Sequence, residues 1–203
     1  TKTDAGASLY LSGSALHYTG AGVAVEHLSS TLQDGQILID HLQVWSGGGT
    51  IGIHLKGAVD IWLDFVSVSG LTFPRTTQGC SVAAMHLEAI SGSPGFVGVG
   101  RVSNSMLRYA AGMGLRIDGG NNLNAWHIHG NRIQGNGICG LYGEGQAMGW
   151  DVGGNDIEGN GSSFPTGGTL GKGSQLYASY PTAWHIHGNY MEPPVGTSAP
   201  IIR

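Results

Sequence analysis

Acidic residues recur at one position of a short pattern that repeats along the chain. Glu88, Asp118 and Glu144 each follow an apolar residue by three positions. If these segments stack as neighbouring strands of one sheet, the carboxylates fall in line about 4.8 Å apart. Carboxylates about 5–5.5 Å apart serve retaining glycoside hydrolysis, and those about 6.5–9.5 Å apart serve inverting hydrolysis. Such close like charges should also raise the pKa of one carboxyl, as a general acid requires.

The adjacent outward position of the same segments carries basic and aromatic side chains. We expect five of them to bind substrate: His54, His86, Arg116, Tyr142 and Tyr177. Asp118 is the predicted catalytic centre, with Glu88 and Glu144 as its partners.

Two other interpretations of these residues remain open. In a polysaccharide lyase, Arg116 or Lys56 would neutralise a uronate, and Tyr142 or His86 would act as the base. Alternatively, the carboxylates are solvated residues at the end of an exposed strand, and Lys56 and Arg116 offset their charge. No catalytic motif decides whether the protein is an enzyme. If it is one, we expect a glycoside hydrolase or a polysaccharide lyase.

Histidines and one aspartate form a second set of residues that could do chemistry. Aligned by the repeats, His127, Asp151 and His185 share one outward column, and His129 and His187 belong to the adjacent one. Imidazoles and a carboxylate on neighbouring strands are ligands for zinc or nickel. However, an open sheet face has no defined pocket, and each histidine recurs because its whole motif recurs. We therefore favour exposed or interface histidines and expect no cofactor.

The strands that would position these side chains are visible in a repeated motif. Residues 126–133, 150–157 and 184–191 each read aromatic, any, branched apolar, any, Gly, Asn, any, apolar. Glycine makes up 37 of 203 residues and charged residues only 11%, which favours many short strands joined by turns over amphipathic helices. Units of this kind bury their apolar face only against the next unit, so the motif predicts a repeat architecture.

Two strand positions can be followed through the repeats. We predict first strands at 22–26, 52–56, 84–88, 114–118, 140–144 and 175–179, and second strands at 37–40, 61–64, 126–129, 150–153 and 184–187. The spacing of about 30 residues leaves room for three short strands per turn. By strand alternation, Trp126, Trp150 and Trp184 fall on the same inward face as the branched apolar residue two positions later. We therefore expect an interior aromatic stack rather than an external sugar-binding ladder. The register of residues 90–111 stays open.

This pattern resembles the coils of right-handed parallel β-helices of the pectate-lyase-like superfamily, which includes bacteriophage tailspikes and many polysaccharide lyases and hydrolases. The likeness covers about residues 20–192. It implies an all-β solenoid of about six coils with three short strands per coil, and a ladder of side-chain amides at Asn131, Asn155 and Asn189. It also implies a homotrimer in a virion tail or on an extracellular surface. Such a protein would bind a bacterial surface polysaccharide and, as an enzyme, cleave it.

The chain fits a single β-helix domain over residues 1–203. Residues 1–20 would lead into coils at 21–192, and residues 193–203 would form a tail. The superfamily's usual caps are missing, which predicts a fragment of a longer chain or an oligomer that covers the ends. The alternative function is therefore a structural, trimerising module without activity.

Charge and hydropathy exclude two classes of partner. A net charge of −4, with scattered Lys and Arg, argues against nucleic acid. No apolar run approaches the length of about 18 residues that a membrane span needs, so we expect no membrane insertion. Cys80 and Cys139 form no metal or redox spacing, and we expect free thiols.

Overall fold

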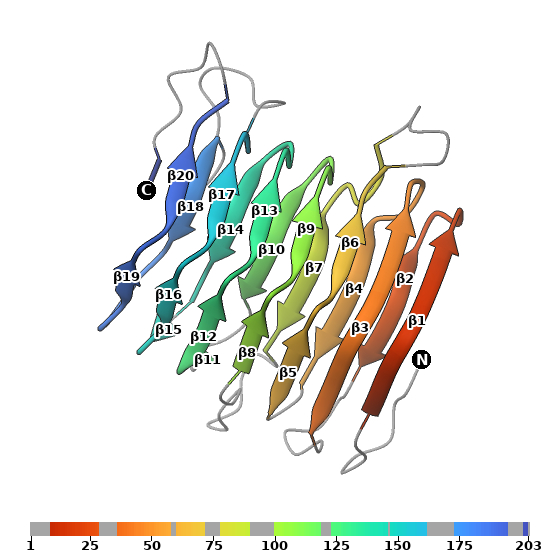
Figure 1. Ribbon diagram of the computed structural model, residues 1–203, viewed down its shortest axis with the longest axis horizontal. Helices are drawn as coiled ribbons and strands as arrows, with labels where there is room; N and C mark the ends of the chain where they lie inside the picture. The colour runs from red at the N-terminus through yellow and green to blue at the C-terminus, as the bar shows by residue number, and fades with distance from the viewer. Residues whose placement is uncertain are drawn as a thin grey trace.

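The protein is an all-β parallel solenoid, as a computed structural model shows (Figure 1). The structure describes residues 9–28, 36–57, 60–71, 78–89, 100–118, 123–145, 147–161, 173–194 and 201–202. Within these ranges every pair of named strands is parallel, and no helix occurs. The predicted parallel β-helix is confirmed at this level.

The first strands of successive turns form one six-stranded sheet, in the order β18-β14-β10-β7-β4-β2. They are β2 (Val23–Leu28), β4 (Ile51–Lys56), β7 (Ala83–Glu88), β10 (Met113–Asp118), β14 (Cys139–Gly143) and β18 (Ser174–Ala178). The outer surface of this sheet is called the first-strand face below.

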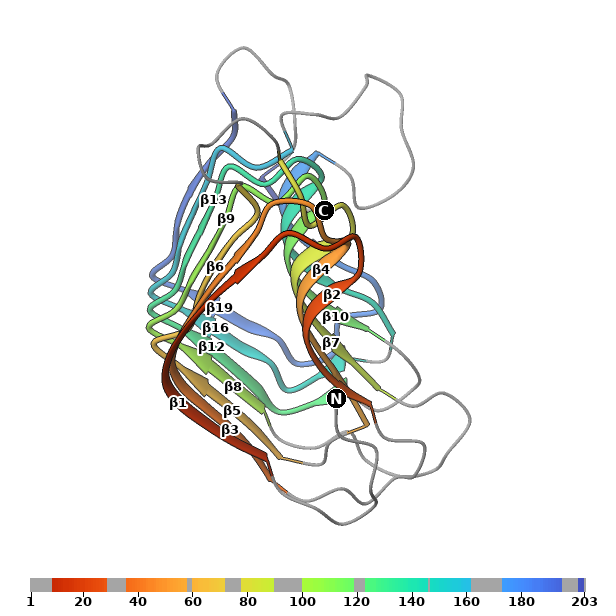
Figure 2. The ribbon, with the colours of Figure 1, turned by 90° about the vertical axis from the view of Figure 1, so that its right-hand side faces the viewer.

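A twelve-stranded sheet forms the other two faces. Two long strands, β1 (Leu9–Tyr18) and β3 (Ile37–Ser46), pair with each other along both faces. The second-strand face continues from β3 through β5 (Ile61–Asp64), β8 (Gly100–Ser103), β12 (Trp126–His129), β16 (Asp151–Gly153) and β19 (His185–His187). The third face continues through β6 (Ser67–Ser69), β9 (Met106–Arg108), β13 (Arg132–Gln134), β17 (Asp156–Glu158) and β20 (Tyr190–Glu192). Figure 2 shows the turns superposed as a three-sided outline, as three strands per turn predict.

A short additional pair, β11 (Leu123–Asn124) and β15 (Ala147–Met148), precedes the second strands of two turns. At the carboxyl end, Ile202 of the predicted tail forms a parallel bridge with Leu176 of β18. Most of that tail, and residues 1–8 of the predicted leading segment, lie outside the described residues.

The solenoid has about four complete turns, not the six predicted from the sequence. β4, β7, β10 and β14 have a neighbour on both sides, whereas β2 and β18 lie at the sheet edges. A turn closes its core only between two neighbours. The ends are accordingly open: β2 is mostly half-buried, and all of β19 is exposed. Their residue pattern is that of a full coil, which explains the overcount.

The second residue of each predicted first strand is apolar and should face the core; Val23, in the segment 22–26, is only half-buried, but the others face the interior. Ile53, Met85, Leu115, Leu141 and Leu176 are all fully buried. Cys80 and Cys139 are buried free thiols, as expected, and burial raises the pKa of Cys80 to about 11 and that of Cys139 to about 12. Neither thiol is therefore an ionised nucleophile at neutral pH.

The predicted tryptophan stack is also interior. Trp126 and Trp150 are fully buried, and Trp184 packs against the core with its ring centroid 4.4 Å from that of Trp150. In the preceding turn Gly100 pairs with Trp126. A Cβ at Gly100 would lie 2.1 Å from the indole, so glycine makes room for the first ring of the stack.

The structure resolves the register between residues 100 and 111. Val102 of β8 pairs with Leu63 and Ile128, and β9 follows on the third face. Residues 90–99 lie outside the described residues. The sequence hid this turn because its second strand begins with glycine instead of the aromatic residue that marks later turns.

One predicted strand register is wrong. Val25, not Val23, pairs with Ile53, so the segment at 22–26 is displaced by two residues. Glu26 therefore lies beside His54 rather than beside Lys56. A shift of two residues keeps the same side chains facing inward, so hydrophobic alternation cannot detect it.

The predicted asparagine ladder is present. The side-chain amide of Asn131 donates to Asn155 Oδ1 at 3.0 Å, and that of Asn155 donates to Asn189 Oδ1 at 2.8 Å. A second ladder, not predicted from the sequence, joins Asn136, Asn160 and Gln175. Asn131 and Asn155 are each followed by another Asn five residues later, which was the available signal.

Candidate functional site

The predicted catalytic and binding residues form a continuous row on the first-strand face. Strand pairing places His54 beside His86, His86 beside Arg116, Arg116 beside Tyr142, and Tyr142 beside Tyr177. The acidic positions align likewise, with Lys56 beside Glu88 and Glu88 beside Asp118. Glu144 directly follows β14, and its backbone N–H donates to Ile117 O. The predicted columns are thus brought together from β4 to β18.

Asp118 is buried at the centre of this row. Its carboxylate accepts a hydrogen bond from His86 Nε2 at 2.6 Å and forms an ion pair with Arg116. Burial alone would raise the pKa of Asp118. The hydrogen bond and charge of His86, together with Arg116, outweigh burial and hold the pKa below its ordinary value of 3.8.

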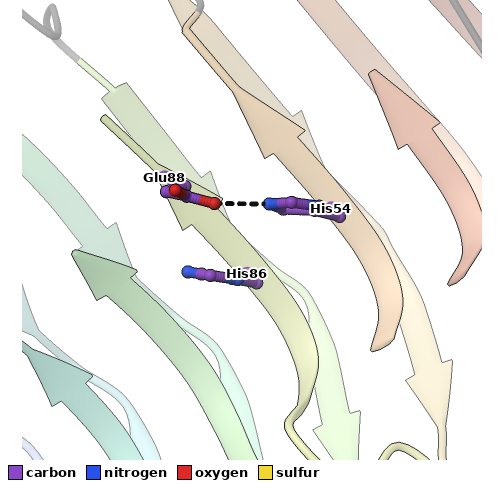
Figure 3. Close-up of side chains that lie close together, drawn as sticks. All are labelled: His54, His86 and Glu88. Carbon is purple, nitrogen blue, oxygen red and sulfur yellow. Dashed lines mark hydrogen bonds and ion pairs between the residues drawn. The ribbon is translucent and has the colours of Figure 1, made fainter. Parts of the chain in front are cut away.

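Glu88 is engaged in the same way one turn earlier (Figure 3). One carboxylate oxygen lies 2.9 Å from His54 Nε2, and the other lies 2.5 Å from Lys56 Nζ. Burial acts to raise the pKa of Glu88, but the hydrogen bonds from Lys56 and His54 outweigh it and lower the pKa. The rings of His54 and His86 stack with centroids 4.8 Å apart.

The expectation that stacked carboxylates would raise one pKa is wrong for Glu88 and Asp118. Glu88 directly contacts the cation of Lys56, and Asp118 directly contacts that of Arg116, so each carboxylate has an opposite charge nearer than a like one. Both are therefore suited to remain ionised rather than to act as a general acid. Glu144 is the third predicted carboxyl. It is exposed and accepts a hydrogen bond from Tyr142 Oη at 2.6 Å.

The two tyrosines form a stacked pair at the end of the row. Their ring centroids are 4.9 Å apart, and the Arg116 guanidinium lies 5.9 Å from the centre of the Tyr142 ring. Burial, followed by the hydrogen bond to Glu144, raises the pKa of Tyr142. This disfavours Tyr142 as the ionised base of a lyase.

Glu26 is a further member of the row that the sequence analysis did not pair with His54. Its carboxylate lies 3.5 Å from His54 Nδ1, so His54 has Glu26 on one side and Glu88 on the other. Only the true register of β2 reveals this contact.

The histidine columns on the second-strand face also converge. Asp151 lies 3.0 Å from His129 Nε2 and 3.0 Å from His187 Nε2, with His127 and His185 at 3.8 and 3.3 Å. The slight burial of Asp151 acts to raise its pKa, but the neighbouring charge of His129 and the hydrogen bond from His187 lower it. The predicted columns are thus correct, and all four histidines meet at the carboxylate of Asp151.

Comparison with known proteins gives no relative from which a function could be transferred: no family model, no curated protein and no solved structure matches the chain. None of the described residues forms a helix long and apolar enough to cross a membrane.

Proposed function

We propose that the protein is a right-handed parallel β-helix of the pectate-lyase-like, tailspike type, which binds a bacterial surface polysaccharide along its first-strand face. The observation that carries this proposal is the continuous row of polar and aromatic side chains from His54 to Tyr177, in register on five adjacent strands. A rigid row can contact several sugars of a linear polymer without the entropy cost of ordering loops. This function places the protein in a virion tail or on an extracellular surface.

The row is suited to hydrogen bonding rather than to stacking of sugars on aromatic faces. Tyr142 lies between Arg116 of β10 and Tyr177 of β18, so neighbouring side chains cover its ring. Glu144 is exposed beside the Tyr142 hydroxyl. Sugar hydroxyls would therefore meet the polar edge formed by Arg116, Tyr142 and Glu144.

Cleavage of the bound polymer is the second part of the proposal. Asp118, kept ionised by His86 and Arg116, would act as nucleophile or base, and the exposed Glu144 would act as acid. Neighbouring strands are about 4.8 Å apart, close to the carboxylate spacing of retaining glycosidases. Glu88 is already paired with Lys56 and His54 and takes no part in this proposed step.

A screen of bacterial surface polysaccharides that records both bound protein and degradation products tests both parts. New reducing ends report hydrolysis, and the absorbance of unsaturated uronates reports elimination. We expect products from wild type and a loss of at least about 100-fold in Asp118→Asn and Glu144→Gln, because each removes a carboxyl group of the proposed pair. Asp40→Asn on the second-strand face is the matched control and should retain activity.

Three outcomes of the screen discriminate between the functions. Binding without products restricts the function to recognition. Equal activity in wild type and Asp118→Asn moves the catalytic centre elsewhere. Neither binding nor products on any glycan contradicts the proposal and favours a structural module.

The second candidate function is a non-catalytic module that assembles as a homotrimer. It is favoured by Trp62 of β5 and by Phe65, which directly follows β5; they expose 46% and 49% of their surface. Apolar groups of this size at a surface mark contact sites. Light scattering should give three times the chain mass for wild type and a smaller mass for Trp62→Ser/Phe65→Asn. A monomeric wild type contradicts the trimer.

A further inference from the structure

The histidine cluster on the second-strand face has the geometry of a metal site. It consists of His127 and His129 of β12, Asp151 of β16, and His185 and His187 of β19. These strands are neighbours in the sheet (Figure 2). Asp151 pairs in register with His127 on one side and His185 on the other. Three successive turns therefore direct side chains to one carboxylate.

The two separations between Asp151 and its ligand partners on β19 fit a tetrahedral ion. Asp151 Oδ1 lies 3.0 Å from His187 Nε2 and 3.3 Å from His185 Nδ1. Two ligand atoms that are each about 2.0–2.1 Å from a zinc ion, at a tetrahedral angle, are about 3.3 Å apart. These three ligand atoms all lie within 4.8 Å of one another, as do those of His127, His129 and Asp151. On the other side of the carboxylate, Asp151 Oδ2 lies 3.0 Å from His129 Nε2 and 3.8 Å from His127 Nδ1. These two distances fit tetrahedral coordination less well.

Gly153 provides the space in which the imidazoles approach Asp151. It pairs with His129 on one side and His187 on the other. A Cβ at Gly153 would lie 2.5 Å from His187 Cε1 and Nε2, and 2.9 Å from His129 Cε1. Both rings therefore lie over the glycine, in space that any other residue would fill.

The other histidine cluster does not offer such a site. His54, His86 and Glu88 also lie close together, but Lys56 Nζ is 2.5 Å from Glu88, and His86 Nε2 donates to Asp118. A dication there would meet an ammonium group. At Asp151, by contrast, the ion-pair partners within the described part of the chain are all histidines.

We propose that Asp151, His185 and His187 hold one divalent transition-metal ion of the zinc class, with His127 and His129 on the opposite side of the carboxylate. Imidazole and carboxylate ligands suit zinc and nickel, and three protein ligands leave the fourth position for water. The cluster has a single carboxylate, which can offset the charge of one dication but not that of two, so a single ion is expected. The ion fastens β19, whose residues are all exposed, to the preceding turn. This revises the sequence-based interpretation of the cluster as simple exposed histidines.

Calorimetric titration with zinc chloride tests the site. We expect one zinc per wild-type chain, with affinity at least about tenfold weaker in Asp151→Asn and in His185→Gln/His187→Gln, since both remove ligands. Gly153→Ala removes no ligand, but its methyl group displaces His187, so it should also weaken binding. His41→Asn changes an exposed histidine outside the cluster and should leave affinity unchanged.

Other results would overturn the proposal. No zinc uptake by wild type, or equal affinity in wild type and Asp151→Asn, contradicts the site. A larger loss in His127→Gln/His129→Gln than in His185→Gln/His187→Gln contradicts the ligand assignment. Circular dichroism checks that each variant is folded. Zinc should raise the melting temperature of wild type but not that of Asp151→Asn, because only a bound ion stabilises the native state.

Discussion

At the scale of single residues, Asp118 should stabilise the fold through its charge. Its pKa in the folded protein lies below the ordinary 3.8, so this stability is present above pH 3.8 and is lost as pH falls through the lower folded pKa. Asp118→Asn should reduce the free energy of unfolding at pH 7 by about 2–4 kcal/mol, because Arg116 and His86 lose a buried partner. Urea unfolding at several pH values should show a flatter acid limb in the variant.

Asp156→Asn is a matched control, because the pKa of Asp156 is shifted in the opposite direction to that of Asp118. The pKa of Asp156 is raised, by burial first and then by the charge of Glu158. Its charge therefore adds no net stability at neutral pH, and the exposed pair with Arg132 is weak. The free energy of unfolding at pH 7 should change by less than about 1 kcal/mol. Equal losses in both variants would contradict the role assigned to Asp118.

Asn155 is the interior rung of the first asparagine ladder. Its side chain donates to Ile128 O and Asn189 Oδ1 and accepts from the backbone and side chain of Asn131. Asn155→Ala leaves buried groups unsatisfied, so we expect a loss of about 2–4 kcal/mol in urea unfolding. Asn189→Ala, at the half-buried end rung, should cost less because water can replace the amide. A larger loss at Asn189 would refute this difference.

At the scale of strands, β8 and β12 pack closely because Gly100 of β8 has no side chain where the Trp126 ring of β12 lies. Gly100→Ala would place a methyl group 2.1 Å from the buried Trp126 ring. We expect the urea concentration at the unfolding midpoint to fall, because overpacking should lower the free energy of unfolding by about 1–3 kcal/mol. In Gly22→Ala, the nearest atom is the Tyr18 hydroxyl, at the end of a side chain and 3.2 Å away, so this control should be nearly neutral. Equal effects would mean that the Trp126 ring does not occupy this position.

Strand prediction from the sequence succeeded where the repeat motif is complete. The aromatic-x-branched-x-Gly-Asn pattern located β12, β16 and β19, and alternation located β4, β7, β10, β14 and β18. It failed for β8, which begins with Gly100, and it misplaced β2 by two residues. Alternation fixes which face a side chain occupies but not its partner on the next strand.

The sequence predicted where the residues of the candidate site lie, but not which ion pairs they form. Parity placed Asp118, Glu88 and Arg116 on one outward face, and the structure agrees. Which opposite charge each carboxylate contacts depends on side-chain conformations that no periodic pattern encodes. The lowered pKa of Asp118 and the convergence of the histidines over Gly153 depend on these side-chain positions.

At the scale of the whole molecule, stability should decrease from the middle of the solenoid to its ends. Inner turns have two neighbours, whereas β19 and β20 have one and are largely exposed. In repeat proteins each interface stabilises only adjacent units, so end units open first. Hydrogen exchange by mass spectrometry should show slow exchange in β10 and β14 and fast exchange in β19, β20 and β2. Uniform protection would contradict this gradient.

Polysaccharide binding at the first-strand face is tested most directly by affinity measurements on immobilised bacterial surface glycans. Wild type should bind at least one glycan. Tyr142→Phe/Glu144→Ala removes the hydrogen-bonding groups of two of the three residues of the polar edge and leaves the core intact, so it should weaken binding by at least about tenfold. His127→Gln on the second-strand face should bind as wild type does. Binding that is absent on every glycan, or unchanged in the double variant, would contradict a polysaccharide site on this face.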